Sequence, residues 1–400
     1  MSGITGIGTT FDLPNYHGEL FALTPSDTPL LSAIGGLTGG GSASAVTFQW
    51  QTYDLRAPGQ NTKLEGATAP TAQERVRSKV ENVAQIHQEK VSVSYTKQAT
   101  SGQYATATAA PFTSPDGGPN PVANELDWQV QQALKSIALD VNYSFINGKW
   151  ANPTTNATAR KTRGLIEAIA TNKANKGTAL VDAATATDTI TVTHALNNGD
   201  KVIFTDTGAA TGIVAGRAYF VVNKATTVSF KVSETLNGTP ITLGTATVQI
   251  LVPQATALAT TDIDDLVQGV YDNGGLADGL GTLLVNSSQK RALTAAYAAA
   301  YGKANPLAGT RNIAGVNVST IETDFGVLNI MLDRHVPQDA IIVASLDQLR
   351  PVFLNVPGKG VFFEEPLAKT GAADEVQIYG EIGLEYGNER AHGIVRGLKV

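Results

Sequence analysis

The stretch from Asn124 to Gly148, NELDWQVQQALKSIALDVNYSFING, decides the fold of this 400-residue chain. Asn124 is a favourable N-cap residue, and Glu125 and Asp127 put negative charge at the positive end of a helix dipole. Gly148 is a typical C-terminal stop. Apolar residues recur every three or four positions, which places them on one side of a helix: Leu126, Val130, Leu134, Ile137, Val141 and Phe145. The stretch therefore predicts one helix about 36 Å long, although a core helix of a globular enzyme has the same pattern.

The composition favours a protein whose surface is covered by other chains. Charged residues make up 16% of the chain, against about 25% in typical soluble proteins. The net charge of −6 disfavours a protein that coats nucleic acid, and the absence of cysteine excludes disulfides and thiolate chemistry. No apolar run approaches a membrane span, and the first basic residue is Arg56. We therefore expect neither a membrane segment nor a secretory signal, and a cytosolic protein follows.

The N-terminal third predicts an arm followed by a projecting hairpin. Residues 1–44 lack Lys and Arg and predict an extended arm with a short helix at 28–36 and a glycine hinge at 39–41. Residues 46–51 alternate as a strand, and a second strand carries Val91, Val93 and Tyr95 on one face. The polar stretch between these strands is unusually long for a compact domain, so we expect it to project.

The remainder predicts an inserted β module within an α+β body. Residues 178–253 are rich in Thr, Val and Ala and contain short alternating runs at 189–192, 201–204, 219–222, 228–232 and 247–250. Helix and strand patterns resume afterwards at 262–271, 282–285, 288–301, 316–321, 340–343 and 376–386.

A search for catalytic motifs finds none. Phosphate-binding, nucleophile-elbow and zinc-protease motifs are missing, and the five histidines are scattered. The acidic run at 262–265 is better explained as charge at a helix start than as a calcium loop. Glu364, Glu365, Glu381 and Glu385 could form a glycosidase pair, but a solvated strand edge explains them more simply. We predict no catalytic residue, no cofactor and no metal.

The order of these parts carries a resemblance to a known family. Local matches are His17–Leu31 in the arm, Phe48–Gln51 and Gln85–Thr96 around the loop, Glu125–Asp140 in the long helix, and Thr323–Gly326 and Lys369–Glu385 near the C-terminus. The chain resembles a tailed-bacteriophage major capsid protein of the Hong Kong phage type. In that fold an N-arm and an extended loop, the E-loop, precede a spine helix, and peripheral and axial domains complete the subunit.

The resemblance implies an α+β fold with five parts. They are an N-terminal arm (1–44), the E-loop hairpin (45–100), the spine helix with the start of the peripheral domain (101–177), an inserted all-β domain (178–253), and the axial domain with the rest of the peripheral domain (254–400). The insertion is similar to a β module found in other phage structural proteins, which by analogy lies on the shell exterior.

The resemblance also implies a non-enzymatic function. Copies of the chain are expected to form pentamers and hexamers of an icosahedral shell around double-stranded DNA, without sequence-specific DNA binding or a membrane. Scaffolding, portal and decoration proteins are further expected partners, in a virion assembled in the host cytoplasm. A tail-tube subunit, or a carbohydrate-active or carbohydrate-binding protein that uses 178–253, remains an alternative.

The expected subunit contacts involve three groups of residues. Phe48, Trp50 and Tyr53 are predicted to anchor the base of the E-loop. The basic residues Arg56, Lys63, Arg75, Arg77 and Lys79 are predicted to pair with acidic neighbours, for which Glu364, Glu365 and Asp374 are candidates. Some relatives of this type cross-link a Lys to an Asn, and Lys63 would be the candidate lysine here.

Overall fold

The computed structural model describes residues 25–72, 74–100, 125–225, 227–276, 280–302, 319–368 and 371–400. These residues group into two compact units. The first contains residues 88–139 and 362–379, and the second contains 28–87, 140–361 and 380–400. Three elements, α3, β4 and β18, contribute residues to both units. The N-cap at Asn124, the link at 101–123 and most of the predicted arm lie outside the described residues.

The first unit is built on β18. This strand spans Ala373–Glu385 and pairs with β4 (Gln85–Ser94) and β17 (Phe362–Pro366). Helix α2 (Tyr95–Thr100) follows β4, and Lys97 forms an ion pair of 2.5 Å with Glu125 at the start of α3. Lys90 of β4 pairs with Glu375 of β18 at 2.9 Å.

The predicted long helix is confirmed as α3, Glu125–Asn147. Its apolar stripe is confirmed at Ile137, Val141 and Phe145, which are buried, but it is wrong at Leu134, which is 41% exposed. In the middle of α3 only Ala133 and Ile137 are buried. In its last two turns more of the helix surface is buried, namely at Val141, Asn142, Phe145 and Ile146.

The body of the second unit is a mixed six-stranded sheet with two helices. The strand order is β13–β14–β12–β15–β19–β5, with β12 parallel to β14 and antiparallel to β15. The strands are β5 (Lys173–Asn175), β12 (Leu280–Val285), β13 (Thr320–Thr323), β14 (Gly326–Leu332), β15 (Ile341–Ala344) and β19 (Gly393–Arg396). Helices α5 (Thr260–Asp272) and α6 (Ser287–Gly302) pack on this sheet through buried Ile263, Val267 and Leu293. Short helices complete the body: α4 (Leu165–Ala168), η1 (Leu346–Gln348) and η2 (Glu389–Ala391).

The described end of the arm is fixed to this unit. The predicted short helix is present as α1 (Pro29–Ala33), with Leu30 and Leu31 buried. The Leu31 N–H donates to Asn142 Oδ1 of α3 at 2.9 Å, and Asn142 Nδ2 donates to Asp333 Oδ2 at 2.8 Å. The buried Asn142 therefore links the arm helix, the spine helix and the loop after β14.

The predicted glycine hinge is wrong at Gly41. Strand β1 (Gly41–Ala43) pairs in parallel with β16 (Arg350–Leu354), which in turn pairs with the end of β18. A Cβ at Gly40 would lie 2.2 Å from the Pro351 carbonyl oxygen, so glycine here permits close strand approach.

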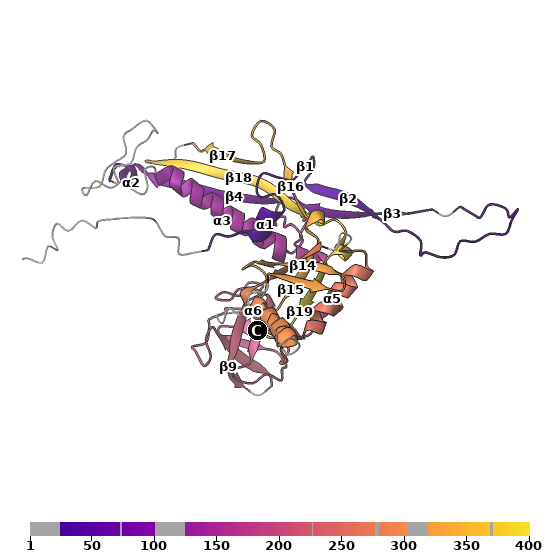
Figure 1. Ribbon diagram of the computed structural model, residues 1–400. Coiled ribbons are helices and arrows are strands. Elements are labelled where there is room, and N and C mark those ends of the chain that lie inside the picture. Colours follow the sequence, from indigo (N-terminus) through magenta and orange to yellow (C-terminus); the bar gives the residue numbers. More distant parts are fainter. Residues whose placement is uncertain are drawn as a thin grey trace, which may run out of the picture. The chain divides into compact units, whose positions relative to one another are not determined.

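The predicted hairpin exists, but with a different second strand. Strand β2 (Thr47–Tyr53) pairs antiparallel with β3 (Arg77–Val83), and residues 54–76 form the excursion between them (Figure 1). The strand with Val91 and Val93 is β4, which pairs with β18 instead, and Tyr95 begins α2. The sequence of β3, RSKVENV, is rich in charged residues and has no alternation of apolar residues, so it did not predict a strand.

The segment 178–252 forms a closed six-stranded barrel in the order β10–β7–β6–β11–β8–β9. The strands are β6 (Thr178–Ala186), β7 (Thr189–Thr191), β8 (Lys201–Asp206), β9 (Ala218–Ala225), β10 (Ser229–Ser233) and β11 (Ala246–Val252). Phe204, Tyr219 and Phe230 are fully buried in its core. The sequence missed β6 because its alternation is weak.

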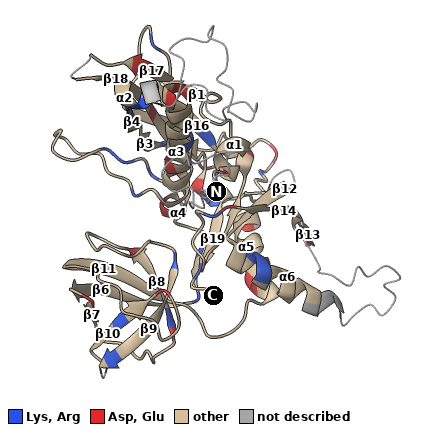
Figure 2. Cartoon of the chain, turned by 90° about the vertical axis from the view of Figure 1, so that its left-hand side faces the viewer, with Lys and Arg blue, Asp and Glu red and all other residues tan. Residues whose placement is uncertain are grey.

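The barrel is joined to the body at several points. Lys149 at the end of the spine helix pairs with Asp206 of β8. The Ala218 N–H donates to Gln338 Oε1 at 3.0 Å, and Lys201 Nζ donates to the Val400 carbonyl at 2.8 Å. Most of the ribbon in Figure 2 is tan, in keeping with the low charge content.

Candidate assembly interface

Two aromatic residues anchor the base of the hairpin. Trp50 Nε1 donates to the Gly387 carbonyl at 2.7 Å, and its ring meets Tyr386 edge-on at 4.8 Å. Phe48 stacks on Trp50 at 6.1 Å and lies so close to Gly383 that a Cβ there would be 2.6 Å from its ring. These contacts lie within one chain, between the start of β2 and the segment around the end of β18.

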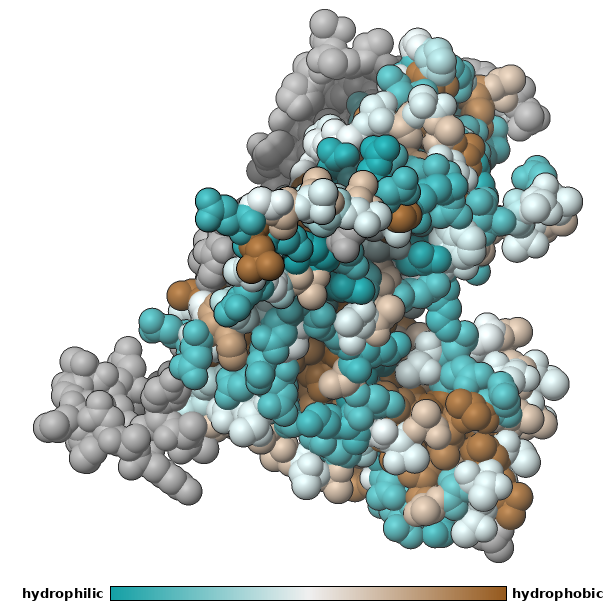
Figure 3. Space-filling view, turned by 90° about the vertical axis from the view of Figure 1, so that its right-hand side faces the viewer, coloured by the Kyte–Doolittle hydropathy of each residue, from teal (hydrophilic) through white to brown (hydrophobic). Residues whose placement is uncertain are grey.

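Beyond this base the loop has little contact with its own chain. Tyr53 is 68% exposed, so it is not part of the aromatic anchor within the chain. Leu55, Leu64 and Val76 are at least three-quarters exposed, which is unusual for apolar side chains. In Figure 3 hydrophobic atoms emerge as separate patches among hydrophilic ones. The loop therefore presents apolar and polar side chains that the chain itself does not cover.

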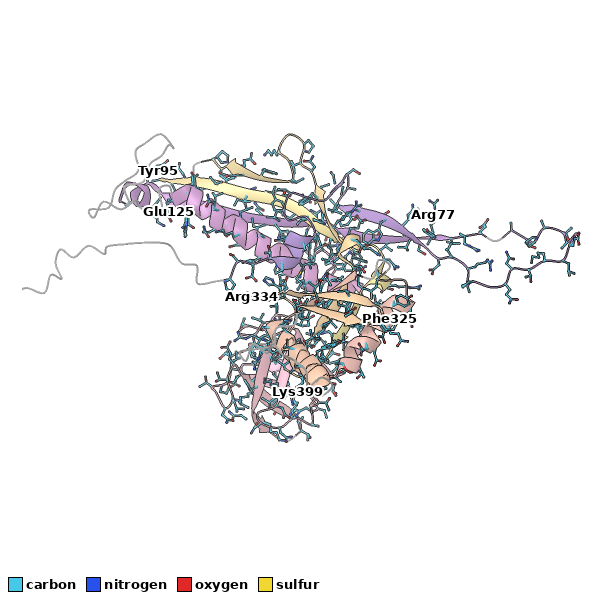
Figure 4. All side chains as sticks on the ribbon, in the orientation of Figure 1. Arg77, Tyr95, Glu125, Phe325, Arg334 and Lys399 are labelled. Carbon is cyan, nitrogen blue, oxygen red and sulfur yellow. The ribbon has the colours of Figure 1, made fainter. Side chains whose placement is uncertain are left out.

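The five basic candidates are exposed. Figure 4 labels Arg77 at the start of β3. Lys79 pairs with Glu81 of its own strand at 3.3 Å, while Arg56 and Arg75 contact only backbone carbonyls next to them in sequence. Within the described part of the chain, no ion pair is formed by Arg56, Lys63, Arg75 or Arg77.

The acidic candidates lie in the other unit. Glu364 of β17 is exposed, and Glu365 and Asp374 are half-buried. The structure therefore does not bring the predicted acidic and basic groups together within one unit. Glu381 and Glu385, weighed above as a glycosidase pair, form ion pairs with Arg160 at 3.2 Å and Arg350 at 2.8 Å.

A cavity of about 720 Å³ adjoins the hairpin. Residues of both strands line it, together with Arg163 of the segment before α4 and the turn at 386–390. Burial alone would raise the pKa of Glu389, but hydrogen bonds from the Thr171 hydroxyl and the Thr171 and Ala170 N–H groups outweigh it and lower that pKa. Sequence reasoning missed Arg163 and Glu389, because neither belongs to an apolar pattern or a motif.

A second cavity, of about 730 Å³, lies between the barrel and the end of the spine helix. Trp150 lines it, and the buried indole N–H has no acceptor within the described structure. The Arg163 guanidinium lies 5.0 Å from the centre of the Trp150 ring. Asp206 also lines this cavity, and its pKa is lowered because the hydrogen bonds from Lys149 and Gly208 outweigh the effect of burial.

Among the described residues, no three side chains of His, Asp or Glu are placed to hold a metal ion. No helix among them is long and apolar enough to cross a membrane. His87 and His392 are buried with lowered pKa values caused by that burial, to about 4 in the case of His87.

Comparisons with known proteins give one family and a set of similar folds. The model of the SU10 major capsid protein family matches residues 3–399. The capsid of cyanophage A-1(L) is similar in structure, with a TM-score of 0.53 and 12% identity, covering 96% of this chain and 97% of that one. No curated protein matches the sequence.

Two further solved structures are similar over nearly the whole chain. A Mycobacterium phage Ogopogo structure has a TM-score of 0.46 and 11% identity, with 96% of each chain covered. The SrpI encapsulin complex of Synechococcus elongatus has a TM-score of 0.47 and 9% identity, covering 97% of this chain and 92% of that one.

Proposed function

The chain belongs to the SU10 major capsid protein family, and we propose from this premise that it is the head-shell subunit of a tailed phage. Its fold is the α+β capsid fold of the Hong Kong phage type with an all-β insertion. Membership of this family implies a structural, non-enzymatic role in the virion capsid. We extend the proposal to an icosahedral shell, built from pentamers and hexamers, that encloses double-stranded DNA.

The single observation that carries the mechanism is the contrast within the hairpin. Its base is fixed by Trp50 and Phe48, while residues 54–76 expose Leu55, Leu64 and Val76 to solvent. A long loop without a core of its own is either functional or disordered. In an assembly the loop lies across a neighbouring subunit and buries apolar area that its own fold leaves exposed.

The basic side chains of the loop fit the same role. Arg56, Lys63, Arg75 and Arg77 have no ion pair within the described residues, so they are available for acidic groups of another copy. Glu364, Glu365 and Asp374 stay the proposed acidic partners. Exposed pairs contribute only about 0–1 kcal/mol each, so they would set register rather than affinity.

The proposal includes finer features that follow from the family. Residues 1–44 serve as the arm, 45–100 as the E-loop, 101–177 as the spine helix with the start of the peripheral domain, 178–253 as the insertion, and 254–400 as the axial domain with the rest of the peripheral domain. Scaffolding, portal and decoration proteins would meet the shell, assembly would occur in the host cytoplasm, and DNA would be enclosed without sequence-specific contacts. The net charge of −6 suits a shell that does not adhere tightly to its DNA.

Sedimentation and negative-stain microscopy of purified protein test this function. Closed shells are the expected result, whereas tubes would indicate a tail-tube subunit. A small species that binds sugars would indicate a carbohydrate-binding protein, and either outcome would overturn the proposal.

Limited proteolysis tests the mechanism separately. Trypsin should cut between Arg75 and Lys79 readily in free subunits and much more slowly in particles, because the neighbouring subunit covers the loop. Equal cutting in both forms would show that assembly does not order it.

A further inference from the structure

The segment that follows the spine helix is strongly basic. Residues 149–176 carry six Lys or Arg side chains and one acidic side chain, Glu167, although the whole chain has a net charge of −6. Lys161 and Lys173 form no ion pair with any residue that the structure describes. The other four basic residues are paired: Lys149 with Asp206, Arg160 with Glu381, Arg163 with Glu167, and Lys176 with Asp262.

Both unpaired lysines, Lys161 and Lys173, line the cavity of about 730 Å³ between the barrel and the end of the spine helix. Asp206 of β8 also lines it and pairs with Lys149. Burial alone would raise the pKa of Asp206, but the hydrogen bonds from Lys149 and Gly208 and the positive charge of Lys161 lower it. One carboxylate therefore faces two lysines, and it can neutralise only one of them.

The remaining charged groups on the cavity walls are balanced. Glu167 accepts the Trp150 backbone N–H at 2.7 Å and lies 3.8 Å from the Arg163 guanidinium. Arg396 donates two hydrogen bonds to the Asp339 carboxylate, at 2.9 and 3.1 Å. The walls are therefore left with the positive charges of Lys161 and Lys173 in excess.

The same walls carry uncharged hydrogen-bond donors. Trp150 lines the cavity, and its buried indole N–H has no acceptor among the described residues. An indole N–H can only donate, and buried donors without an acceptor are rare in proteins. Tyr143 is a second lining residue, and burial together with the negative charge of Asp206 raises the pKa of its hydroxyl, which therefore stays protonated. An acceptor that also carries negative charge would match these walls.

The barrel and the body are fixed against each other at this cavity. Gly216 and Pro337 both line it, and a Cβ at Gly216 would lie 3.1 Å from Pro337. The Gln338 N–H donates to the Gly216 carbonyl at 2.8 Å, and the Ala218 N–H donates to Gln338 Oε1 at 3.0 Å. The cavity therefore exists before any ligand binds, and its volume is in the range of small-ligand sites.

We propose that this cavity binds a phosphate group through Lys161, Lys173 and the indole N–H of Trp150. A phosphate group at neutral pH carries a charge of about −1.5 to −2, which matches two lysines, and its several oxygens can accept from donors on different walls. The inference needs only one folded chain, so its failure would leave the proposed function untouched.

Titration of the full-length chain with sodium phosphate tests the charges of the site, with sodium chloride at equal ionic strength as the reference. Phosphate should bind and raise the melting temperature, because it binds the folded state only. Lys161→Gln and Lys173→Gln should each weaken phosphate binding about fivefold or more, because each removes a charged donor. Lys135→Gln is the matched control, since it removes an exposed lysine of α3 that does not line the cavity.

The three lysines are exposed, so these variants should keep the circular dichroism and the melting temperature of the wild type without phosphate. Equal affinity in all three variants overturns the inference. Wild-type binding weaker than about 10 mM also overturns it.

Trp150→Phe tests the indole separately. It keeps an aromatic ring beside Arg163 but removes the buried N–H, so phosphate binding should weaken by about fivefold, the worth of one hydrogen bond. Phosphate should also change the tryptophan fluorescence of the wild type and of Trp128→Phe, but not that of Trp150→Phe. Unchanged affinity and an unchanged fluorescence response in Trp150→Phe would overturn the assignment of the indole to this site.

A competition experiment identifies the source of the phosphate group. A short DNA duplex is added to the chain in the presence of sodium phosphate, at the same ionic strength. Displacement of phosphate from the wild type, but not from Lys135→Gln alone, would contradict a site at Lys161 and Lys173. Displacement from both identifies the phosphates of a nucleic-acid backbone as able to enter the cavity, whereas phosphate binding that the duplex leaves unchanged identifies a small phosphate compound as the ligand.

Discussion

The inserted barrel buries its large apolar side chains, whereas the loop of the E-loop hairpin leaves its apolar side chains exposed. The barrel closes six strands on themselves and buries Phe204, Tyr219 and Phe230 completely. Among the described residues the hairpin is a sheet of two strands with both edges open, and Leu64 in its loop is 86% exposed. Closure removes the strand edges to which other chains could add, whereas the hairpin keeps them. The difference teaches that the barrel forms a hydrophobic core from its own residues, whereas the loop has apolar side chains that its own chain does not bury.

Removing the barrel is the largest change to the chain, and the rest of the protein should tolerate it. The two ends of the insertion are held together, because the Lys176 N–H donates to the Arg396 carbonyl and the Gln254 N–H to the adjacent Gly397 carbonyl, both at 2.8 Å. Replacing 178–252 by a short Gly-Ser linker should leave a body that folds and assembles, since loop-closure cost grows slowly with length. The excised barrel should unfold cooperatively in circular dichroism. Inclusion bodies from the deletion together with a disordered isolated barrel would contradict this.

Phe230→Ala should be the most damaging single substitution in the barrel. The ring is fully buried and meets His194 edge-on at 5.0 Å. Loss of a buried aromatic ring leaves a cavity and costs about 3–5 kcal/mol, which denaturant unfolding would measure. Val228→Ala is the matched control at a side chain that is 52% exposed, with an expected change within about 0.5 kcal/mol. Trypsin cutting of the hairpin loop should stay unchanged, and faster cutting would show that the two regions are coupled.

Acid should destabilise the packing around the start of β4. His87 lies in this strand, and burial lowers its pKa to about 4. Because the unfolded chain binds a proton near the ordinary pKa of about 6.5, stability is lost as pH falls from there towards 4. The maximum loss is about 3 kcal/mol by the difference between these pKa values. His87→Leu should remove this part of the decline in denaturant midpoints between pH 7 and pH 4.5, and an unchanged decline would refute the assignment.

Trp50→Phe should have the smallest effect and should act on the hairpin alone. It keeps an aromatic ring against Tyr386 but removes the hydrogen bond to the Gly387 carbonyl. The expected cost is about 1 kcal/mol, seen as faster trypsin cutting between Arg75 and Lys79 in free subunits. Tyr53→Phe is the control, because that side chain is exposed. Equal acceleration in both variants would mean that Trp50 does not anchor the loop.

Much of the fold was predictable wherever one face of an element is buried. Helices α3 and α5 and strand β18 carry strong apolar periodicity, and all three are present. Strand β3 was missed because its sequence, RSKVENV, is largely charged or polar and its exposed and buried residues do not alternate: Arg77, Ser78 and Lys79 are exposed, whereas Asn82 and Val83 are buried. Leu134 was wrongly predicted to be buried, because periodicity shows which face of a helix is apolar but not how much of that face other elements contact.

The contacts at the base of the hairpin were predictable only in part. Phe48 and Trp50 were singled out because aromatic residues alternate in an amphipathic strand, and both make contacts within the chain. The turn at 386–390 that receives Trp50 lies more than 330 residues away in sequence, and no local pattern marks it. The acidic partners that we propose for Lys63 and Arg77 belong to another copy of the chain, and a pattern within one sequence does not show contacts between copies.

Hydrogen–deuterium exchange on free subunits and on assembled particles tests the central claim most directly. The account predicts that peptides from 54–76 exchange fast in the subunit and become strongly protected in the particle. Peptides from the core strands β8, β9 and β10 should be protected to the same extent in both forms. Equal exchange of 54–76 in both forms, or barrel strands that gain protection only on assembly, would contradict it.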